Sequence, residues 1–422
     1  MTNGVSRRNL LLSTIIGIFG IAAYSNHRGI RYPLMSWEPE MPANSIRRNS
    51  NLFMLDQLLA LPSKDATEVA MRALGPEPKL TISPSKTSSQ LQLRLNNVSP
   101  RARLIRDGSI GSQVEEKTLG LTRQITISLE PGSEIELRWQ LPQHEGLQFA
   151  AIGDTGAGSE LEWCIKRAAE LGATFLFHLG DFNYAEGDYA RALHAFESAE
   201  IPCYVSVGNH DFHDRGLVYA DFLTRIGPFN SAFSLGKTRF VNLDTAASFM
   251  PISGGARGRF VQQMVADTQI DQHTIIVTHR PLVDPDKDDD HDLGSKRERA
   301  WLLEKFEAMG ADTMLCGHIH IFSRSQIGSL DQIVVGQGLG HQDLLVNDIT
   351  ESKIALGTIQ SGGAVEWQFL PLMMPLTLHC HPRTEAVKAT LRNGPHAQSV
   401  AAVDQACASG HKKSARAASK AL

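Results

Sequence analysis

The stretch "ATFLFHLGDFNYAEGD", residues 173–188, combines a buried strand with an unusual turn. Residues 173–179 are mostly apolar and rich in Phe and Leu, which is typical of a short strand buried in a core. Asp181 and Tyr184 follow this strand, whereas a turn that only reverses the chain needs neither a carboxylate nor a phenol. The stretch predicts a core strand whose carboxyl end carries functional side chains.

Strand-like and helix-like segments alternate on both sides of this stretch, from about residue 147 to residue 370. The predicted strands are 147–154, 173–181, 202–211, 238–244, 273–280 and 311–320, and the predicted helices are 159–172, 189–199, 258–267 and 295–310. Short β-like runs close the region. This alternation predicts an α/β domain over residues 147–370.

Polar residues follow five of these strands. They are Asp154; Asp181 and Tyr184; Asn209, His210 and Asp211; His279; and His318 and His320. One such Asp alone is commonly a helix N-cap, and one His alone is commonly a satisfied polar group. In an open α/β sheet, however, ligands bind beyond the carboxyl ends of the strands. Five strand ends carrying metal-ligand residue types therefore predict a single site.

Two other interpretations of the glycine-rich segments do not fit their spacing. A dinucleotide-binding fingerprint needs G-x-G-x-x-G, but "AIGDTGAGSE" places its glycines at Gly153, Gly156 and Gly158. The G-x-S-x-G elbow of serine hydrolases is absent from the sequence.

The rest of the chain divides into three parts. Residues 79–142 alternate apolar and polar residues between turns, which predicts a small antiparallel β-sandwich. Residues 26–78 are predicted to be a linker with short helices at 51–62 and 65–75, where apolar residues have helical spacing. Residues 371–422 show no sustained period and are predicted to be a solvated, disordered tail.

The N-terminus has the layout of an export signal over residues 1–25. Arg7 and Arg8 precede an apolar stretch from Leu10 to Ala23 that is short for a transmembrane helix. The arginine pair resembles a twin-arginine signal and so predicts a periplasmic or extracellular location and contact with the twin-arginine export machinery. An ordinary secretory signal and an uncleaved membrane anchor are the alternatives.

The composition gives no sign of a nucleic-acid-binding protein. Hydrophobic residues make up 42% of the chain and the formal net charge is only −4, so the protein is globular and no nucleic-acid binding is evident. The cysteines do not suggest a disulfide framework: Cys164, Cys203 and Cys316 are predicted to be core thiols, and Cys380 and Cys407 fall in the tail.

The five strand-end blocks, in this order, resemble the calcineurin-like metallophosphoesterases, and within them the purple acid phosphatases. The family pattern is D-x-G, G-D-x-x-Y, G-N-H-D/E, V-x-x-H and G-H-x-H; the matching segments are 154–156, 180–184, 208–211, 276–279 and 317–320. The departure is Ile276, which stands where the pattern has Val. The resemblance, over about 147–340, implies a four-layer αββα sandwich, and the family also includes members with a preceding β-sandwich domain.

The resemblance further implies two metal ions. Asp154, Tyr184 and His320 would bind one ion, Asn209, His279 and His318 would bind the other, and Asp181 would bridge them. Gly156 stands where the wider superfamily has a His ligand, which Tyr184 would replace. A ferric ion paired with divalent Fe, Zn or Mn would leave a small positive charge that attracts an anionic phosphate ester.

Three further residues are predicted to act on the substrate. We expect His210 to hydrogen-bond the phosphoryl group or to protonate the leaving oxygen, with Asp211 orienting its ring. His291, in the acidic loop "DPDKDDDHD", is a second candidate of this kind; a solvated charged loop is the alternative.

The sequence therefore predicts hydrolysis of phosphate monoesters by a hydroxide that two metal ions activate. A phosphodiesterase or nucleotide hydrolase on the same site is the first alternative. A non-catalytic scaffold or binding protein on the same fold, or a redox role for an iron pair, is also open.

Overall fold

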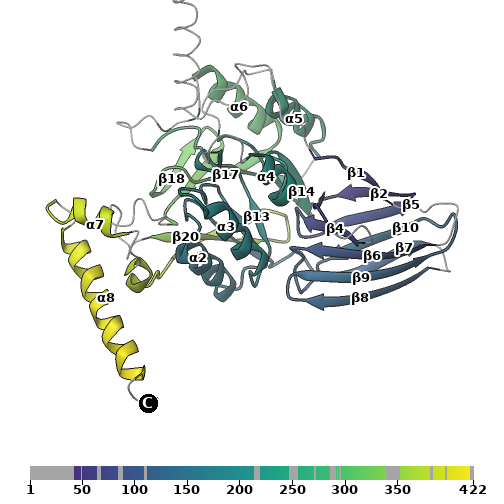
Figure 1. The fold of residues 1–422 in the computed structure, drawn as a ribbon. Coiled ribbons are helices and arrows are strands. Elements are labelled where there is room, and N and C mark those ends of the chain that lie inside the picture. Colours follow the sequence, from purple (N-terminus) through teal and green to yellow (C-terminus); the bar gives the residue numbers. More distant parts are fainter. Residues whose placement is uncertain are drawn as a thin grey trace, which may run out of the picture.

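The computed structural model describes residues 42–48, 50–63, 68–83, 89–108, 112–212, 219–246, 255–269, 272–285, 291, 293, 296–338, 352–380, 384–394 and 397–418. The predicted export signal lies outside these residues. Within them, no helix has both the length and the apolar character needed to cross a membrane. A β-sandwich lies beside a larger α/β domain (Figure 1).

The β-sandwich consists of two sheets. The first has the strand order β1 (Ser45–Arg48), β2 (Asn51–Asp56), β5 (Lys79–Ser83), β10 (Ile135–Gln140), β7 (Arg103–Gly108). The second has the order β3 (Leu58–Ala60), β4 (Glu68–Ala73), β6 (Ser89–Asn96), β9 (Thr122–Leu129), β8 (Gln113–Leu119). All pairs are antiparallel except β4 with β6. The predicted sandwich ahead of the α/β domain is confirmed.

The helices predicted at 51–62 and 65–75 are wrong, because these segments form β2, β3 and β4 of the sandwich. Along β2, burial alternates, with Asn51, Phe53 and Leu55 inside. The apolar spacing of this segment fits both the helical and the strand period, and pairing with β5 selects the strand. The sandwich thus begins at β1 rather than at residue 79.

The α/β domain contains two mixed sheets that face each other. One has the order β13 (Cys203–Val205), β12 (Leu176–His178), β11 (Gln148–Ile152), β20 (Lys353–Ile359), β21 (Val365–Pro371). The other has the order β14 (Ser231–Leu235), β15 (Thr238–Asn242), β16 (His273–Val277), β17 (Ala311–Cys316), β19 (Leu330–Val335), β18 (Phe322–Ile327). The strands that precede the predicted site residues, namely β11, β12, β13, β16 and β17, are parallel within their sheets.

Helices cover the outer face of each sheet. The first sheet carries α2 (Ser159–Glu170) and α3 (Asp188–Glu197), and the second carries α5 (Gly255–Ala266) and α6 (Lys296–Ala308). Short helical turns, namely η2 (His210–Phe212), α4 (Tyr219–Asp221) and η3 (Phe222–Ile226), lie in the connections. The layers are therefore helix, sheet, sheet, helix, and the predicted four-layer αββα sandwich is confirmed (Figure 1).

Strand alternation divides the core into three layers. Along β11, Phe149 and Ala151 face the second sheet, while Ala150 and Ile152 face the helices. Aromatic rings fill the space between the sheets: Phe149, Phe175, Phe177, Phe233, Phe240 and Trp367. This rigid packing fixes the strand ends that carry the site.

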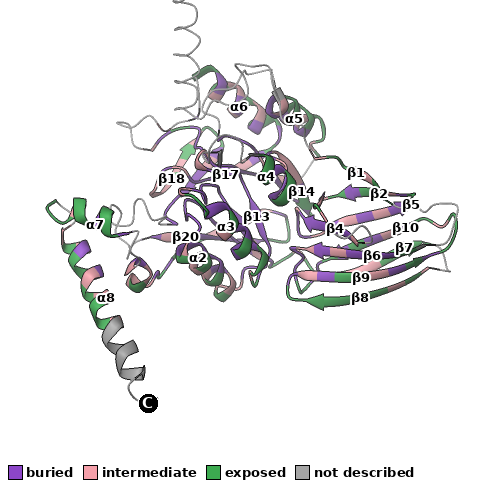
Figure 2. Ribbon diagram, viewed as in Figure 1, coloured by how far each residue is buried: buried purple, intermediate pink, exposed green. Residues whose placement is uncertain are grey.

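The segment after residue 371 is not a disordered tail where the structure describes it. It forms η4 (Leu376–Cys380), α7 (Glu385–Leu391) and α8 (Ala397–Ala418). Val400 and Val403 of α8 are buried against the first sheet's helical layer, although much of α8 is exposed (Figure 2). The prediction failed because only a narrow apolar stripe in an Ala- and Ser-rich sequence makes this contact.

A disulfide joins Cys380 to Cys407 and ties η4 to α8. This pair is not predicted by the sequence pattern, which places both cysteines in the tail. The other three, Cys164, Cys203 and Cys316, are free and buried, so the prediction of core thiols is confirmed.

Candidate metal centre

Three of the predicted site residues adopt a backbone conformation that is rare outside glycine. Asp154 follows β11 with φ of 62°, Asp181 follows β12 with φ of 61°, and His318 follows β17 with φ of 68°. Non-glycine residues in this left-handed region cost energy, and such residues cluster at functional sites. The strand ends are therefore shaped to aim these side chains.

Two glycines make room for the aspartates. A Cβ atom at Gly208 would lie 2.2 Å from Asp181 Oδ1, and one at Gly317 would lie 2.4 Å from Asp154 Oδ2. Any side chain at either position would displace a carboxylate. The glycines that precede Asn209 and His318 in their motifs thus have a packing role.

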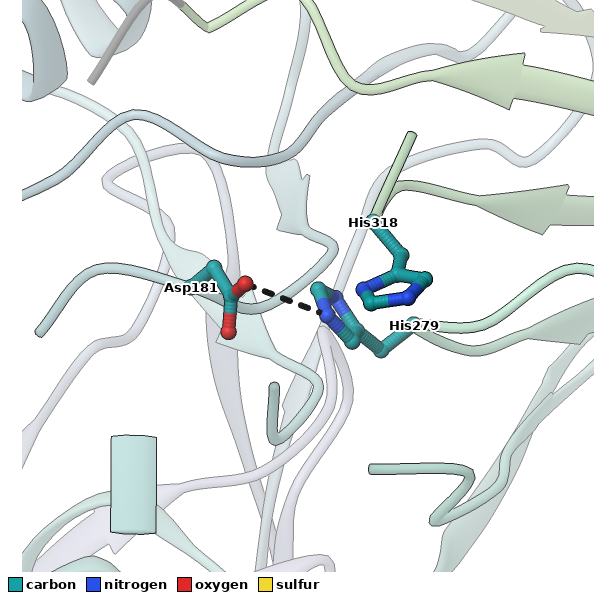
Figure 3. A group of neighbouring side chains, drawn as sticks. All are labelled: Asp181, His279 and His318. Carbon is teal, nitrogen blue, oxygen red and sulfur yellow. Dashed lines mark ion pairs between the residues drawn. The ribbon is translucent and has the colours of Figure 1, made fainter. Parts of the chain in front are cut away.

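The clearest ligand cluster combines Asp181, His279 and His318 (Figure 3). One ligand atom from each lies within 4.8 Å of those of the other two. His279 Nε2 is 3.3 Å from Asp181 Oδ2 and 3.0 Å from Asn209 Oδ1. His279 and His318 face each other with ring centroids 5.0 Å apart. The structure thus brings Asn209, His279 and His318 together beside Asp181, as the sequence predicts.

The hydrogen bonds of His279 test whether this cluster fits a cation. Its Nδ1 lies 2.7 Å from Leu179 O, which can only accept, so Nδ1 carries the proton. In the neutral ring the Nε2 lone pair then faces the oxygens of Asp181 and Asn209. These three groups are held together by a positive charge between them, which a proton on Nε2 or a metal ion supplies. Metal-ligating histidines characteristically donate their other N–H to a carbonyl in this way, so the residues fit a metal ion.

The second predicted ligand set also comes together. His320 Nε2 is 3.4 Å from Asp154 Oδ1 and 3.5 Å from the Tyr184 hydroxyl. Among the residues that the structure describes, none hydrogen-bonds the buried Asp154 Oδ1, while Oδ2 accepts from the backbone of His318 at 2.9 Å. Since Asp154 directs one unbonded carboxylate oxygen at His320 and contacts His318, it connects the two sets. A buried carboxylate oxygen that accepts no hydrogen bond from the described residues is a second feature that fits a bound cation.

The turn that carries Tyr184 is held by Asp188, the first residue of α3. Asp188 Oδ2 accepts from the backbone N–H groups of Tyr184 at 3.0 Å and Ala185 at 2.7 Å. The carboxylate thus holds the turn that leads into the helix. The phenol is therefore presented toward His320 by a fixed backbone.

His210 lies where the sequence places it, beside the ligands. Its ring packs on Tyr184 with centroids 4.6 Å apart, and its backbone N–H donates to Asp181 Oδ1 at 2.8 Å. That hydrogen bond leaves Asp181 Oδ2 for His279. His210 is thus coupled to both predicted ligand sets.

Asp211 has a different role from the one predicted. Its carboxylate accepts from the backbone N–H groups of Asp181, Phe182 and Gly208, at 3.0, 2.9 and 2.7 Å, rather than from the ring of His210. Burial, with the charge of Asp181, raises the pKa of Asp211 to about 7, and the backbone donors oppose that shift. Asp211 holds the Asp181 and Asn209 turns together. The prediction failed because sequence adjacency to His210 does not determine side-chain direction.

His291 reaches the site from its acidic loop. Its ring lies against His318 with centroids 5.1 Å apart, and its backbone N–H donates to Asp284 at 3.0 Å. The ring is 39% exposed, so it is accessible to a ligand. The structure therefore brings His291 to the edge of the candidate centre.

Sequence reasoning missed His178, which is fully buried in β12. Its Nδ1 accepts from Gly180 N–H, and its Nε2 donates to Thr155 Oγ at 2.8 Å. Burial lowers its pKa to about 3, so the ring is neutral. It joins the turns that carry Asp154 and Asp181. Its position at the end of an apolar strand was the available signal.

Burial and neighbouring charges act differently on the clustered groups. Burial opposes ionisation of Asp181, but His279 outweighs it and keeps the pKa of Asp181 below its usual range. Burial, reinforced by Arg280, lowers the pKa of His318 well below its ordinary value. Burial opposes protonation of His279, but Asp181 and Asp154 outweigh it and raise its pKa. Asp181 and His318 therefore already have the ionised and neutral forms that bind metals, and His279 would release its extra proton on binding a metal ion.

Comparison with known proteins gives a family for this domain. The family model for calcineurin-like phosphoesterases matches residues 147–322. Serine/threonine-protein phosphatase CPPED1 of Rattus norvegicus is 29% identical over 182 residues, which are 40% of this chain and 58% of the rat protein. The match thus covers less than two thirds of that relative.

Two phosphatases are among the solved structures that this chain matches. The purple acid phosphatase PPD1 from yellow lupin (Lupinus luteus) seeds has a TM-score of 0.44 at 14% identity, with 70% of each chain covered. A dimetal phosphatase from Danio rerio has a TM-score of 0.40 at 12% identity, covering 54% of this chain and 97% of that one.

The αββα sandwich and the residues at its strand ends are those expected of a metallophosphoesterase domain. Residues 147–322, less than half of the chain, match the model of the calcineurin-like phosphoesterase family. The family expected from the five sequence blocks is confirmed.

Proposed function

We propose that this protein hydrolyses phosphate monoesters at a centre of two metal ions. The observation that carries the proposal is the convergence of two ligand sets on neighbouring strand ends, one around His279 and one around His320. Asp154, Tyr184 and His320 would hold one ion, Asn209, His279 and His318 the other, and Asp181 would bridge them. When bound, two such ions supply Lewis acidity and a water acidic enough to act as nucleophile near neutral pH.

The protein's own side chains account for binding and proton transfer. His210 and His291 flank the ligand sets, against Tyr184 and His318 respectively. Imidazoles at these positions can donate hydrogen bonds to phosphoryl oxygens and give a proton to the leaving oxygen. Asp211 and His178 contribute by fixing the turns. A rigid arrangement of this kind stabilises developing charge without reorganisation during the reaction.

Substrate class is tested by comparing an aryl phosphate monoester with the corresponding diester, on metal-replete and chelated protein. We expect the monoester to have the higher kcat/KM and chelator to abolish the rate. Faster turnover of the diester would favour the phosphodiesterase alternative. Failure to hydrolyse either ester, with both metals bound, would favour a scaffold.

Tyr184 favours a ferric ion in the first position. A phenol has a reference pKa of about 10 and ionises readily against a highly charged hard cation. The second ion would be divalent Fe, Zn or Mn, since histidine, asparagine and carboxylate ligands suit several metals.

The metal-replete protein should therefore show a broad visible absorption band that Tyr184→Phe removes, because only the phenolate provides the charge transfer. The measurement is an absorption spectrum of both proteins, with iron content determined by elemental analysis. A band retained in Tyr184→Phe, or no band in the fully iron-loaded wild type, would show that Tyr184 does not bind Fe(III).

The protein acts outside the cytoplasm in this proposal. The Cys380–Cys407 disulfide supports it, because disulfides persist mainly in oxidising compartments. The arginine pair Arg7 and Arg8 points to the twin-arginine route.

Replacing both Arg7 and Arg8 with Lys should leave the protein inside the cell with Cys380 and Cys407 reduced. Cell fractionation and thiol labelling measure these two effects. Export of the variant at the wild-type level would rule out the twin-arginine route.

A further inference from the structure

Arg280, the residue directly after His279, lies at the candidate centre and has no role in the mechanism so far. Its Nη1 donates to His318 Nε2 at 2.6 Å. Its side chain is 7% exposed, and Nε donates to Ala246 O at 3.4 Å. Burying a guanidinium is costly unless the charge is paired and hydrogen-bonded.

The backbone of Arg280 is fixed by a hydroxyl pair. Thr245 Oγ accepts from the N–H groups of His279 and Arg280, at 3.2 and 2.7 Å. Thr278 lies 2.6 Å from the same hydroxyl and donates to Leu243 O. The backbone of Arg280 is therefore held in a fixed position between β16 and the turn after β17.

Arg280 cannot support His318 as Leu179 supports His279. A guanidinium carries only donors, so Arg280 donates to the lone pair of His318 Nε2 and cannot accept a hydrogen bond from an N–H of that ring. Second-shell partners of ligating histidines are acceptors: carboxylates, carbonyls or water. Arg280 is a donor where such a partner must be an acceptor, so it does not position His318 in the usual way. Its donors match an anion instead.

We propose that Arg280 binds the phosphoryl oxygens of the substrate, as a cationic clamp beside His318. This inference rests on the proposed function and extends it to a specificity-determining residue. A planar guanidinium can bond two phosphoryl oxygens at once. A monoester dianion offers one more anionic oxygen than a diester, so Arg280 favours monoesters.

The test is the affinity of the metal-replete protein for inorganic phosphate, measured by calorimetry on wild type, Arg280→Met and Arg280→Lys. Arg280→Met should weaken the Kd by about 10- to 100-fold, the range of a charge-assisted hydrogen bond. Arg280→Lys, which keeps the charge without the planar fork, should lie between. Bound metal, determined by elemental analysis, should not change.

Arg324→Met is the matched control. Arg324 is an exposed arginine of β18, 52% accessible, that pairs with Asp331. This variant removes the same charge away from the candidate centre and should leave phosphate affinity unchanged. Arg280→Met should also lower kcat/KM more for an aryl monoester than for the diester.

Unchanged phosphate affinity in Arg280→Met would overturn the inference. A lower affinity that is fully explained by loss of bound metal would also overturn it. The proposed function fails separately. A wild type that binds phosphate through Arg280 but hydrolyses no ester would refute the hydrolase and leave the clamp standing.

Discussion

Asp181→Asn should reduce kcat/KM for an aryl phosphate monoester by about 100- to 1,000-fold, since removing one key electrostatic group of an active site costs about that much. Asp181 is the only carboxylate in the described cluster with His279 and His318, and it is the proposed bridge. The amide removes a negative charge and places a donor or a weaker acceptor opposite His279. Bound metal should fall below two equivalents. Kinetics and elemental analysis measure both effects.

Asp312→Asn provides a control of the same chemistry. Asp312 Oδ2 lies 2.8 Å from His273 Nδ1 at the opposite end of β16 and β17. This variant removes a carboxylate paired with an imidazole but should keep full activity and metal content. An Asp181→Asn protein with two metals and the wild-type rate would contradict the bridging role.

Asp211→Ala should destabilise the fold by about 3 kcal/mol or more and remove most activity. Three backbone N–H groups would lose their acceptor, and each unsatisfied buried donor costs about 1–3 kcal/mol. Relief of charge repulsion with Asp181 offsets a part of that cost. The turns that carry Asp181 and Asn209 would separate. Thermal unfolding and the rate on an aryl monoester are the measurements.

Asp211→Asn distinguishes the effect of the negative charge from the effect of the hydrogen-bond acceptor, because it removes only the charge. One amide oxygen can still accept from the backbone, so this variant should be destabilised less than Asp211→Ala. If Asp211→Ala unfolds as the wild type does, the carboxylate does not hold the turns.

Much of the candidate centre is predictable from the sequence because parallel strands force their carboxyl ends together. Asp154, Asp181, His279 and His318 converge as the strand assignment requires. The side-chain directions are not predictable in the same way. Asp211 turns to the backbone rather than to its neighbour His210, and this depends on three-dimensional packing.

Other features depend on contacts that no local pattern encodes. The segment 51–62 fits two periods, and only pairing with β5 selects the strand. The last helix is anchored by Val400, Val403 and a disulfide, a signal too sparse to outweigh its polar composition. Arg280 lies directly after the fourth motif and is not part of it. Only its contact with His318 indicates that it lies at the candidate centre.

The most direct test of the account is a metal titration of the chelated protein. The initial rate on an aryl phosphate monoester would be followed as iron and a divalent partner are added, with bound metal counted at each point. The account predicts that activity rises to a maximum at two bound ions per chain. Full activity with one ion or none, or no activity with both sites filled, would contradict it.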